Sequence, residues 1–476
     1  MNVEVSVVGL GKLGACMAAA IASRSVRTTG VDVNSSPVEA MREKRAPIFE
    51  PGLAEMIAGC DGLLGATQDL EAAIRNSEIT FVVVPTPSNK EGAFSLEYVS
   101  EAMRAVGRAL QAKPEYHLVV LTSTVLPGST EYLIRPLLEE TSGKTCGPDF
   151  GLCYSPEFIA LGSVLRDFLN PDFLLVGECD AKAGSRLAAF YRDSLRLTAP
   201  VARMSAINAE LAKIALNTYV TSKITFANML AEICERLPGG DVDAVTGALG
   251  LDQRIGSKYL KGALGYGGPC FPRDNQALAR FMEQIGLSSD LPRTVDQVNH
   301  RQAGRVVGLV NRLSSGKAQR VSVLGLAYKP DTNVVEQSQG IAIACQLVRE
   351  GYDVAVFDPA ATENARRALG DSVHYASNIA DCVRGATVIV LATDWPEFRS
   401  LFHQTANNVP RPAIVDGWRM LRGSSGFDDI GYHPVGLGGS NLETRERLRH
   451  FAESLAAPRS SKVRKHAVAS SVGSPR

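Results

Sequence analysis

The stretch VSVVGLGKLGACMAAAIASRSVRTTGVDVN, residues 5–34, decides the fold of the first part of the chain. An apolar strand over residues 3–8 leads into a glycine-rich turn, a helix of small residues and a second strand that ends at Asp32. This strand–turn–helix–strand order is that of a Rossmann unit. Further strands are predicted by apolar segments at 79–87, 117–124 and 150–156. Alternating strands and helices indicate an α/β protein with a parallel, doubly wound sheet.

The turn GLGKLG carries the pattern Gly9-x-Gly11-x-x-Gly14. Gly9 permits the tight turn, Gly11 lets a pyrophosphate approach the backbone, and Gly14 allows the helix to pack closely on the strand. The helix N-terminus offers free N–H groups to the anion. At the end of the second strand, the Asp32 carboxylate can bind a ribose 2′-hydroxyl and repel a 2′-phosphate. The spacing therefore predicts an NAD site, and the alternative is a glycine turn kept only for packing.

The same pattern returns near residue 321, which predicts a second Rossmann-like domain. VSVVGL (5–10) is answered by VSVLGL (321–326), VDVN (31–34) by VFDP (356–359), and FVVVPTP (81–87) by VIVLATD (388–394). The turn of this second copy reads GLAYKP and lacks the second and third glycines. We therefore expect that it does not hold a dinucleotide in the same way.

Between the repeats, residues 205–237 are expected to form one long helix, because apolar residues recur at helical spacing without Gly or Pro. Such a helix usually spans two domains or forms a subunit contact. The fold class is therefore α/β, with two Rossmann-like doubly wound domains joined by a long central helix. We predict an NAD-binding domain (1–203), a central dimerisation domain with the cysteine loop (204–312), a Rossmann-like domain (313–445) and a disordered tail (446–476).

The composition is that of a globular protein and excludes several classes. The chain has 50 Lys+Arg and 50 Asp+Glu residues, so it lacks the basic excess of a broad nucleic-acid surface. No apolar run is long enough to cross a bilayer, and the N-terminus leads directly into a strand rather than a signal peptide. The nine cysteines form no CxxC pair, which argues against a metal site and a disulfide framework. We expect a cytoplasmic protein, because a reducing compartment keeps thiols free.

One cysteine stands in an unusual setting, GYGGPCFPRD, residues 265–274. In an NAD enzyme, a thiolate at Cys270 can add to an aldehyde product, and the adduct can then lose a second hydride to give a thioester that water cleaves. This chemistry needs a cation or donors for the oxyanion and a group that orients water. If a helix starts at Pro272, Asp274 lies near the thiol. Lys213 and Asn217 share a face of the long helix and can hold an oxyanion; the alternative is a solvated lysine and a packing asparagine.

From about residue 3 to 440, the chain resembles the nucleotide-sugar dehydrogenases, the family that acts on UDP-glucose, GDP-mannose and related sugars. The segments that carry the resemblance are VVGLGKLG (7–14), PIFEPGL (47–53), VVPTPS (83–88), STVLPGST (123–130), SPEFIALGS (155–163), ELAKIALNTYVTSKITFAN (210–228), DQRIGSKYLKGALGYGGPCFPRD (252–274), GLAYKPDT (325–332), ATDWPEF (392–398) and VDGWRML (415–421).

The resemblance implies a role for each matching residue. The catalytic residues would be Cys270 as nucleophile, Lys213 and Asn217 for oxyanions, Asp274 to order water, and Glu157 and Thr124 to position water or take the first proton. The NAD site would include Gly9, Gly11, Gly14, Asp32, Thr86 and Thr124, with the segment around Glu50 closing near it. The substrate would meet Phe158, Ile159, Lys213, Tyr259, Gly267, Tyr328 and Lys329, and Arg254 would reach it from the other subunit of a homodimer or larger homo-oligomer. We expect that a side chain at Gly267 or Gly268 would occupy space that the substrate needs.

The sequence departs from the family pattern at four places. Arg273 stands for the usual lysine after CFP, and Leu161 stands where a second glutamate is usual. Glu336 stands where an arginine is frequent. In DGWRML, the arginine used for substrate recognition is displaced, with Trp418 in its place and Arg419 after it. We expect Trp418 to serve packing more than substrate contact.

The resemblance implies oxidation of the C6 hydroxymethyl of UDP-glucose to UDP-glucuronate, with two NAD reduced and a cysteine hemithioacetal and thioester as intermediates. The same reaction on another nucleotide sugar, such as a UDP-N-acetylhexosamine, is the nearest alternative. A non-catalytic sensor of nucleotide sugars would have lost Cys270, Lys213 or Asp274. A dehydrogenase for a single oxidation would not need Cys270.

Overall fold

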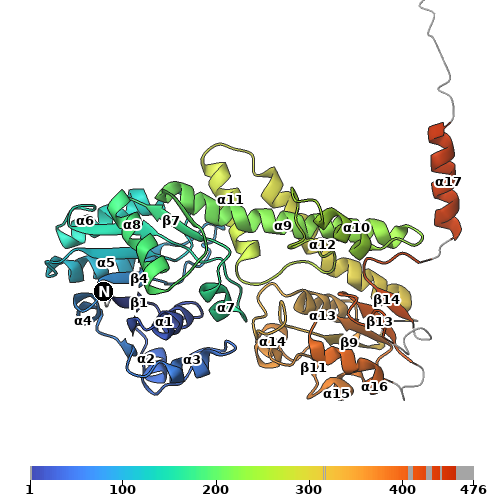
Figure 1. Ribbon diagram of the computed structural model, residues 1–476. Coiled ribbons are helices and arrows are strands. Elements are labelled where there is room, and N and C mark those ends of the chain that lie inside the picture. Colours follow the sequence, from blue (N-terminus) through green and yellow to red (C-terminus); the bar gives the residue numbers. More distant parts are fainter. Residues whose placement is uncertain are drawn as a thin grey trace, which may run out of the picture.

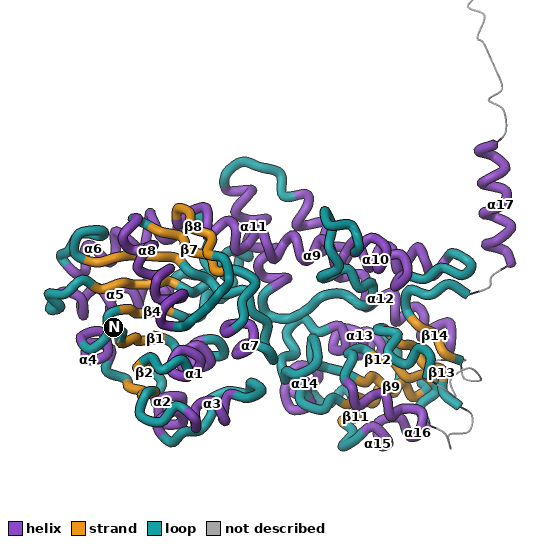
Figure 2. The backbone as a smooth tube through the Cα atoms, viewed as in Figure 1, coloured by secondary structure: helices purple, strands orange, loops and turns teal. Residues whose placement is uncertain are grey.

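The computed structural model describes residues 3–314, 316, 318–405, 411–424, 431–439 and 442–456. Two Rossmann-like domains lie side by side, and a long helix runs along both of them (Figure 1). The strands fall into two separate groups, one in each domain (Figure 2). The predicted fold class is therefore confirmed.

The first domain is built on an eight-stranded sheet with the order β3-β2-β1-β4-β5-β6-β7-β8. Its strands are β1 (Glu4–Val8), β2 (Arg27–Val31), β3 (Leu64–Thr67), β4 (Ile79–Val82), β5 (His117–Leu121), β6 (Phe150–Tyr154), β7 (Leu174–Glu178) and β8 (Val201–Ser205). Neighbouring strands pair in parallel except β6 with β7. The strand order reverses between β1 and β4, and ligands of such sheets bind at the carboxyl ends of the strands there.

Helices cover both faces of this sheet, so its central strands are buried. The helices are α1 (Gly14–Ser23), α2 (Ser35–Arg42), α3 (Leu53–Gly59), α4 (Leu70–Arg75), α5 (Glu97–Gln111), α6 (Arg135–Ser142), α7 (Val164–Leu169) and α8 (Ala181–Ala189), with short π-helical segments at Thr130–Ile134 and Phe190–Ser194. In α1, residues 14–22 are all buried. Their small side chains let the helix lie close to the sheet, which keeps the glycine turn at its start in place.

The second Rossmann-like domain contains a six-stranded parallel sheet with the order β11-β10-β9-β12-β13-β14. Its strands are β9 (Arg320–Leu324), β10 (Asp353–Phe357), β11 (His374–Tyr375), β12 (Val388–Leu391), β13 (Ala413–Asp416) and β14 (Tyr432–Pro434). Its helices are α13 (Gln339–Arg349), α14 (Thr362–Leu369), α15 (Ile379–Val383) and α16 (Leu401–Thr405), with a 3₁₀ turn at Pro396–Ser400. The predicted repeat of the Rossmann pattern is therefore present.

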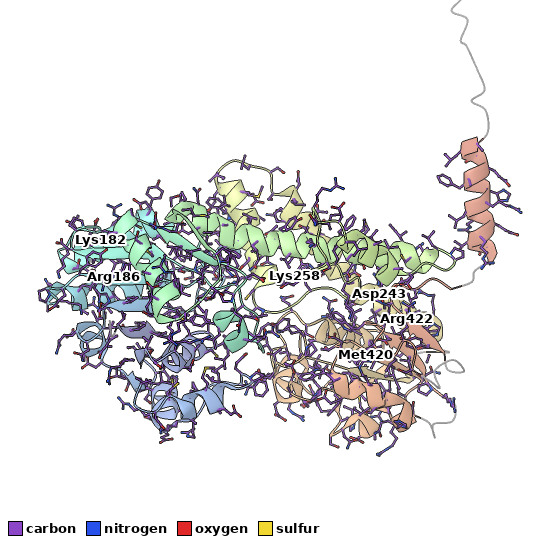
Figure 3. All side chains as sticks on the ribbon, viewed as in Figure 1. Lys182, Arg186, Asp243, Lys258, Met420 and Arg422 are labelled. Carbon is purple, nitrogen blue, oxygen red and sulfur yellow. The ribbon has the colours of Figure 1, made fainter. Side chains whose placement is uncertain are left out.

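The segment between the two sheets is helical, with α9 (Ala206–Arg236), α10 (Val242–Gly250), α11 (Phe271–Gln284) and α12 (Asp290–Leu313). Helix α9 has 31 residues and packs against α11 and α12. The glycine-rich loop 256–268 lies between α10 and α11, and Lys258 of this loop lies near the middle of the molecule in Figure 3. The long helix predicted at 205–237 is thus present.

The predicted tail is only partly within the described residues. Leu442–Ala456 form helix α17, so residues 446–456 are helical rather than disordered, because the helix formers Leu, Glu, Arg and Ala dominate this segment. Residues 457–476 lie outside the described part of the chain. In that described part, no helix combines the length and the apolar character needed to span a membrane.

Candidate active site

The glycine turn of the first domain has room for a diphosphate. Gly9 has φ +98°, and a Cβ there would lie 2.3 Å from the Val83 carbonyl oxygen. A Cβ on Gly14 would lie 1.8 Å from the Gly9 oxygen, so helix α1 touches the turn directly. At Gly11, by contrast, a Cβ would meet no atom within 4 Å. The turn therefore leaves the Gly11 backbone open, beside the N-terminus of α1, which no side chain caps.

Asp32 follows β2 and braces this turn. Its Oδ2 accepts the Leu10 N–H at 2.7 Å, and its Oδ1 accepts the Asn34 N–H at 2.9 Å. The residue is partly exposed, and each carboxylate oxygen keeps a lone pair for a further donor. An open glycine backbone, free helix N–H groups and an accessible carboxylate fit the diphosphate and ribose of NAD.

The second domain repeats the packing of the glycine turn, but its carboxylate is buried. A Cβ on Gly340 would lie 2.0 Å from the Gly325 oxygen, the relation that Gly14 has to Gly9. Gly340 therefore takes the packing role of the third glycine of the pattern, although the loop 326–338 separates it from the turn. Asp358, the counterpart of Asp32, is buried and accepts hydrogen bonds from Leu326, Ala327 and the Trp395 indole. Buried in this way, the carboxylate presents no surface to a ribose.

The predicted nucleophile lies at the start of a helix. Cys270 is the N-cap of α11, and the Asp274 N–H donates to the Cys270 carbonyl at 2.8 Å. Cys270 is exposed, whereas the Asp274 side chain is 1% exposed. The start of the helix thus places the buried carboxylate one turn from an accessible thiol, as expected from Pro272.

Lys213 and Asn217 of α9 reach the same place. The Asn217 Nδ2 donates to Asp274 Oδ2 at 2.6 Å, and the Lys213 Nζ donates to the Glu157 carbonyl at 2.6 Å. Both residues are buried, so a solvated lysine is excluded. The structure therefore brings four of the predicted catalytic residues to Cys270 from three segments of the chain.

Burial tunes the titration of this cluster. It raises the pKa of Glu157 to about 7, while the nearby Lys213 opposes the shift. It lowers the pKa of Lys213, against the attraction of Asp274 and Cys270. The pKa of the Cys270 thiol is raised by the protein that surrounds it and by Asp274, and is lowered by Arg273 and Lys213. A carboxyl with a pKa near 7 suits a group that exchanges protons at neutral pH.

Arg273 is a residue of this cluster that sequence reasoning did not assign to the site. Its Nε and Nη2 lie 3.2 and 3.1 Å from Asp274 Oδ1, and its Nη1 lies 3.4 Å from the Thr86 carbonyl oxygen. The guanidinium also lies 4.8 Å from the centre of the Phe94 ring. Arg273 thus joins α11 to the first domain. Its position between CFP and Asp274 was the available signal.

Thr86 and Thr124 follow β4 and β5, at the sheet edge that carries the glycine turn. The Ser123 hydroxyl donates to the Val84 carbonyl at 2.7 Å and accepts the Val84 N–H at 2.9 Å. These bonds hold the two loops together. Thr86 is buried and Thr124 is partly exposed, so only Thr124 offers its side chain to the edge.

Phe158 and Ile159 differ in their surroundings. The Lys213 Nζ lies 4.6 Å from the centre of the Phe158 ring, so Phe158 belongs to the catalytic cluster. Ile159 is partly buried and packs against the core of the first domain. Glu50, predicted to close near the cofactor, accepts the N–H groups of Gly162 and Val164 at 2.8 and 2.7 Å. It therefore anchors the start of α7.

The glycines before Cys270 contact the second domain, which corrects our expectation. A Cβ on Gly267 would lie 2.4 Å from the Gln337 carbonyl oxygen. A Cβ on Gly268, where φ is +86°, would lie 2.8 Å from the Tyr328 ring. The space that we assigned to substrate is thus occupied by Tyr328 and Gln337, and these glycines let two domains meet beside the thiol.

The remaining predicted substrate residues are spread around this junction. Lys329 is partly buried, and burial lowers its pKa against the attraction of Asp167 and Glu50. Tyr259 has φ +65°, is 51% exposed and packs edge-on against Phe271.

Arg254 is not brought to the cluster within this chain. Its guanidinium pairs with Asp252 at 2.6 Å, and 88% of its side chain is exposed. Within this chain, Arg254 therefore lies in solvent.

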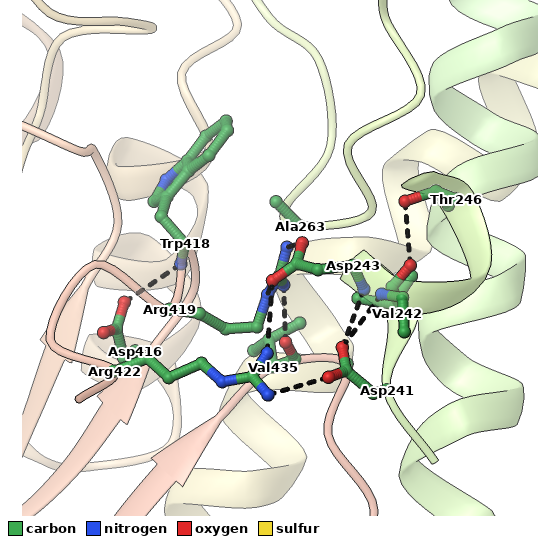
Figure 4. Close-up of polar contacts among 12 residues, drawn as sticks. Asp241, Val242, Asp243, Thr246, Ala263, Asp416, Trp418, Arg419, Arg422 and Val435 are labelled. Carbon is green, nitrogen blue, oxygen red and sulfur yellow. Dashed lines mark hydrogen bonds and ion pairs between the residues drawn. The ribbon is translucent and has the colours of Figure 1, made fainter. Parts of the chain in front are cut away.

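The neighbouring side chains of Arg419 and Trp418 contact different parts of the molecule. The Arg419 guanidinium is 1% exposed and binds both oxygens of Asp243 at 2.7 and 2.8 Å, which fastens the second domain to α10 (Figure 4). The Trp418 indole donates to the Ala392 carbonyl at 3.0 Å, and the Lys261 Nζ lies 5.5 Å from its ring. Trp418 and Lys261 line a cavity of about 490 Å³, so Trp418 both packs and faces open space. Asp243, Met420 and Arg422, which also line this cavity, lie together at that end of the molecule (Figure 3).

Comparison with protein-family models covers most of the chain. Residues 3–195 match the NAD binding domain of the UDP-glucose/GDP-mannose dehydrogenase family, residues 207–301 match its central domain, and residues 322–423 match its UDP binding domain. These three segments correspond to the glycine-turn domain, the α9–α12 region and the second sheet.

Relatives that match most of the chain are named as dehydrogenases of the two sugars in this family description. The UDP-glucose 6-dehydrogenase AglM of Haloferax volcanii is 36% identical over 428 residues, 89% of this chain and 99% of that protein. The GDP-mannose 6-dehydrogenase of Azotobacter vinelandii is 31% identical over 86% of this chain and 94% of that protein. The solved UDP-glucose dehydrogenase of Pyrobaculum islandicum is 37% identical, with a TM-score of 0.83 over 92% of this chain and 98% of that one.

The glycine turn, the cysteine with its buried cluster and the second sheet fall, in this order, in the segments that match the three models. The chain belongs to the UDP-glucose/GDP-mannose dehydrogenase family and is an NAD-dependent nucleotide-sugar dehydrogenase.

Proposed function

We propose that this enzyme oxidises the C6 hydroxymethyl of UDP-glucose to the carboxylate of UDP-glucuronate, with two NAD reduced per sugar. The observation that carries the proposal is the accessible Cys270 beside Asp274, Asn217 and Lys213. A single alcohol oxidation needs a base and no thiol. A thiol beside oxyanion donors suits the further oxidation of an aldehyde to an acid.

In the first oxidation, Glu157 takes the hydroxyl proton of C6, for which its pKa near 7 suits it. NAD, when bound, accepts a hydride from C6 in each of the two oxidations. The Cys270 thiol then loses its proton to solvent, its sulfur forms a bond to the aldehyde carbon, and the carbonyl oxygen becomes an alkoxide. Lys213 and Asn217 stabilise this oxyanion with an ammonium and an amide N–H.

Loss of the second hydride leaves C6 as a thioester on Cys270. Asp274 orients a water molecule and accepts a proton from it as the water oxygen bonds to this carbon. The thiolate leaves, and the second proton of the water passes to solvent as the carboxylate forms. The carboxylate of Asp274 is held for this role on two sides, by the Asn217 amide and by Arg273. Both contacts fix the direction of the carboxylate.

Two observations bear on which sugar enters. Relatives named as UDP-glucose 6-dehydrogenases come from Haloferax volcanii and from Bacillus subtilis, and they favour UDP-glucose. In the other direction, Trp418 lines the cavity of the second domain, and Leu161 lines a cavity between the domains. Both stand where the family pattern has charged residues, which keeps a UDP-N-acetylhexosamine as the second candidate substrate.

We further propose a homodimer that forms through α9. Tyr219, Phe226, Met229 and Ile233 of this helix are between 43% and 62% exposed and recur at helical spacing, so they form one apolar stripe. An exposed stripe of this kind marks a protein–protein contact. Arg254, free of the cluster in its own chain, would enter the neighbouring site. Light scattering at several concentrations tests this assembly, and a monomer throughout would contradict it.

We retain the division into 1–203, 204–312, 313–445 and 446–476 as a proposal, with the structure in the last part limited to helix α17. A cytoplasmic location is proposed because Cys270 must stay a free thiol to act.

Product identification tests the substrate. The purified enzyme is given NAD with UDP-glucose, UDP-N-acetylglucosamine, UDP-N-acetylgalactosamine or GDP-mannose, and the products are identified by mass spectrometry. We expect a uronate from UDP-glucose alone. A uronate from an acetylated sugar instead would move the proposal to the second candidate, and no acid product from any of them would overturn it.

A further inference from the structure

A cavity of about 570 Å³ separates the glycine turn from the second domain. The first domain lines it with Lys12, Phe49 and Leu161 among others, and the second domain lines it with the segment 332–336 and with Arg367. Lys12 is the residue between Gly11 and Leu13 of the glycine turn. The cavity therefore opens beside the place where the turn presents its backbone to the NAD diphosphate.

Across this cavity, the Lys12 Nζ lies 3.8 Å from Glu336 Oε1. The two side chains are 51% and 53% exposed. An ion pair this long and this exposed to water contributes little stability, so either partner can exchange it for a better one. A diphosphate at the N-terminus of α1 would be such a partner for Lys12, because it carries negative charge on several oxygens.

The charge of Glu336 has the opposite consequence. A carboxylate beside the glycine turn repels a diphosphate, unless a cation neutralises it. Lys12 supplies this cation in the pair described above. Arg367 lines the same cavity as Glu336, so a second cation faces this space. The charges around the cavity thus allow Arg367 to replace Lys12 as the cation near Glu336.

The same residues touch the cysteine loop. The Gly268 N–H donates to the Glu336 carbonyl at 2.9 Å, two residues before Cys270. Gln337 has φ +53°, a left-handed conformation that is uncommon for a residue with a side chain. Such strain persists where surrounding contacts enforce it, and here the backbone of Gly267 packs against Gln337. Burial raises the pKa of the Cys270 thiol, and the positive charge of Lys12 opposes this shift, after Arg273 and Lys213.

We propose that Lys12 is a cofactor-binding residue that exchanges Glu336 for the diphosphate of NAD, and that this exchange alters the reactivity of Cys270. The inference rests on the NAD site and not on the identity of the sugar, so it survives a change of substrate. In this proposal, Glu336 competes with the NAD diphosphate for Lys12. The reactivity of the Cys270 thiol then depends on whether NAD is bound at the turn.

Equilibrium binding tests the first half, with ADP-ribose as probe because it carries the diphosphate without nicotinamide. Isothermal titration of the full chain should show about 10-fold weaker binding in Lys12→Gln. Glu336→Gln should bind ADP-ribose several-fold more tightly, and this gain should vanish in the double variant. Lys44→Gln, which breaks an exposed pair with Asp61 of the same domain, is the matched control and should bind as the wild type does. Wild-type affinity in Lys12→Gln would overturn the assignment.

Thiol labelling tests the second half. The rate of Cys270 alkylation by iodoacetamide is followed by peptide mass spectrometry, with and without saturating ADP-ribose, at pH 8. The Glu336 carbonyl holds the Gly268 N–H two residues before Cys270, so exchange at Glu336 should shift the cysteine loop. ADP-ribose should therefore change the alkylation rate of the wild type and of Lys44→Gln severalfold. The response should be largely lost in Lys12→Gln at saturation. A wild type without response, or a full response in Lys12→Gln, would contradict the proposed exchange.

Discussion

The Asn217 amide donates to the Asp274 carboxylate at 2.6 Å, across 57 residues of sequence. This bond joins the long helix α9 to the helix that begins at the nucleophile. It means that the residue proposed to hold an oxyanion also holds the residue proposed to orient water. The groups proposed for the oxidations and for the hydrolysis are therefore joined by one hydrogen bond, so displacement of one should displace the other.

Replacing Asp274 by Asn should slow hydrolysis of the thioester more than the oxidations that precede it. The amide keeps the shape but cannot accept a proton from water, so turnover should fall by at least about 100-fold. Stopped-flow absorbance should then show a burst of NADH followed by a slow phase, with an acylated Cys270 peptide in the mass spectrum. Asp290→Asn, on the exposed start of α12, should behave as the wild type does. Uniform slowing without a burst would show that Asp274 acts before the thioester.

Gly267→Ala should loosen the contact between the cysteine loop and the second domain. Its Cβ would lie 2.4 Å from the Gln337 carbonyl oxygen, which is backbone and cannot rotate away. Relieving such a clash costs about 1–3 kcal/mol, so the thermal midpoint should fall. Gly247→Ala in α10 is the control, because a Cβ there meets no atom within 4 Å and alanine favours a helix. Equal midpoints for the two variants would contradict the domain contact.

Stability of the first domain should fall as the pH drops below 6.5. His117 is buried in β5, its Nδ1 lies 3.1 Å from the Ser77 carbonyl oxygen, and its Nε2 lies 2.7 Å from Thr80 Oγ1. Burial lowers its pKa from 6.5 to about 3. Between these values the unfolded chain binds a proton that the folded chain does not, so this group reduces the free energy of unfolding by about 1.4 kcal/mol for each pH unit.

Urea titrations at pH 7.5 and 5.5 measure this loss. His117→Gln should remove about 1.4 kcal/mol of the difference between the two pH values, because the unfolded histidine takes up its proton within this range. His374→Gln, at a residue with 53% of its side chain exposed, should leave the difference unchanged. If the slopes of His117→Gln and the wild type coincide, the buried histidine is not the source.

Asp32→Ala should reduce the preference for NAD over NADP. The substitution removes both the acceptor for the ribose 2′-hydroxyl and the charge that repels a 2′-phosphate. It also removes the bond to the Leu10 N–H, so binding of NAD itself should weaken. Dissociation constants for both cofactors, with Asp61→Ala as an exposed control, give the ratio. An unchanged ratio would show that Asp32 stabilises the turn but does not select the cofactor.

Local patterns predicted the parts of this molecule that depend on neighbours in sequence. The glycine turn and Asp32 lie within one strand–helix–strand unit, and α9 shows its helical period over its whole length. The helix that starts beside Cys270 followed from Pro272. The geometry of these features depends on residues that are close in sequence, so the sequence alone was enough to predict them.

Contacts between distant segments could not be predicted. Arg419 is buried against Asp243, 176 residues away, and nothing near DGWRML indicates that partner. Gly267 and Gly268 were expected to make room for substrate, yet they make room for Tyr328 and Gln337 of another domain. Gly340 packs as the third glycine of a turn from which a loop separates it. Each depends on how the domains pack, which no short window of sequence contains.

The ratio of NADH formed to UDP-glucose consumed tests the central claim most directly. The wild type should give two NADH for each sugar, because Cys270 carries the aldehyde through a second oxidation. Cys270→Ser should still bind UDP-glucose, but it should stall after the first oxidation or as a covalent adduct. A ratio of one in the wild type, or full turnover of Cys270→Ser at the wild-type rate, would contradict the role assigned to the thiol.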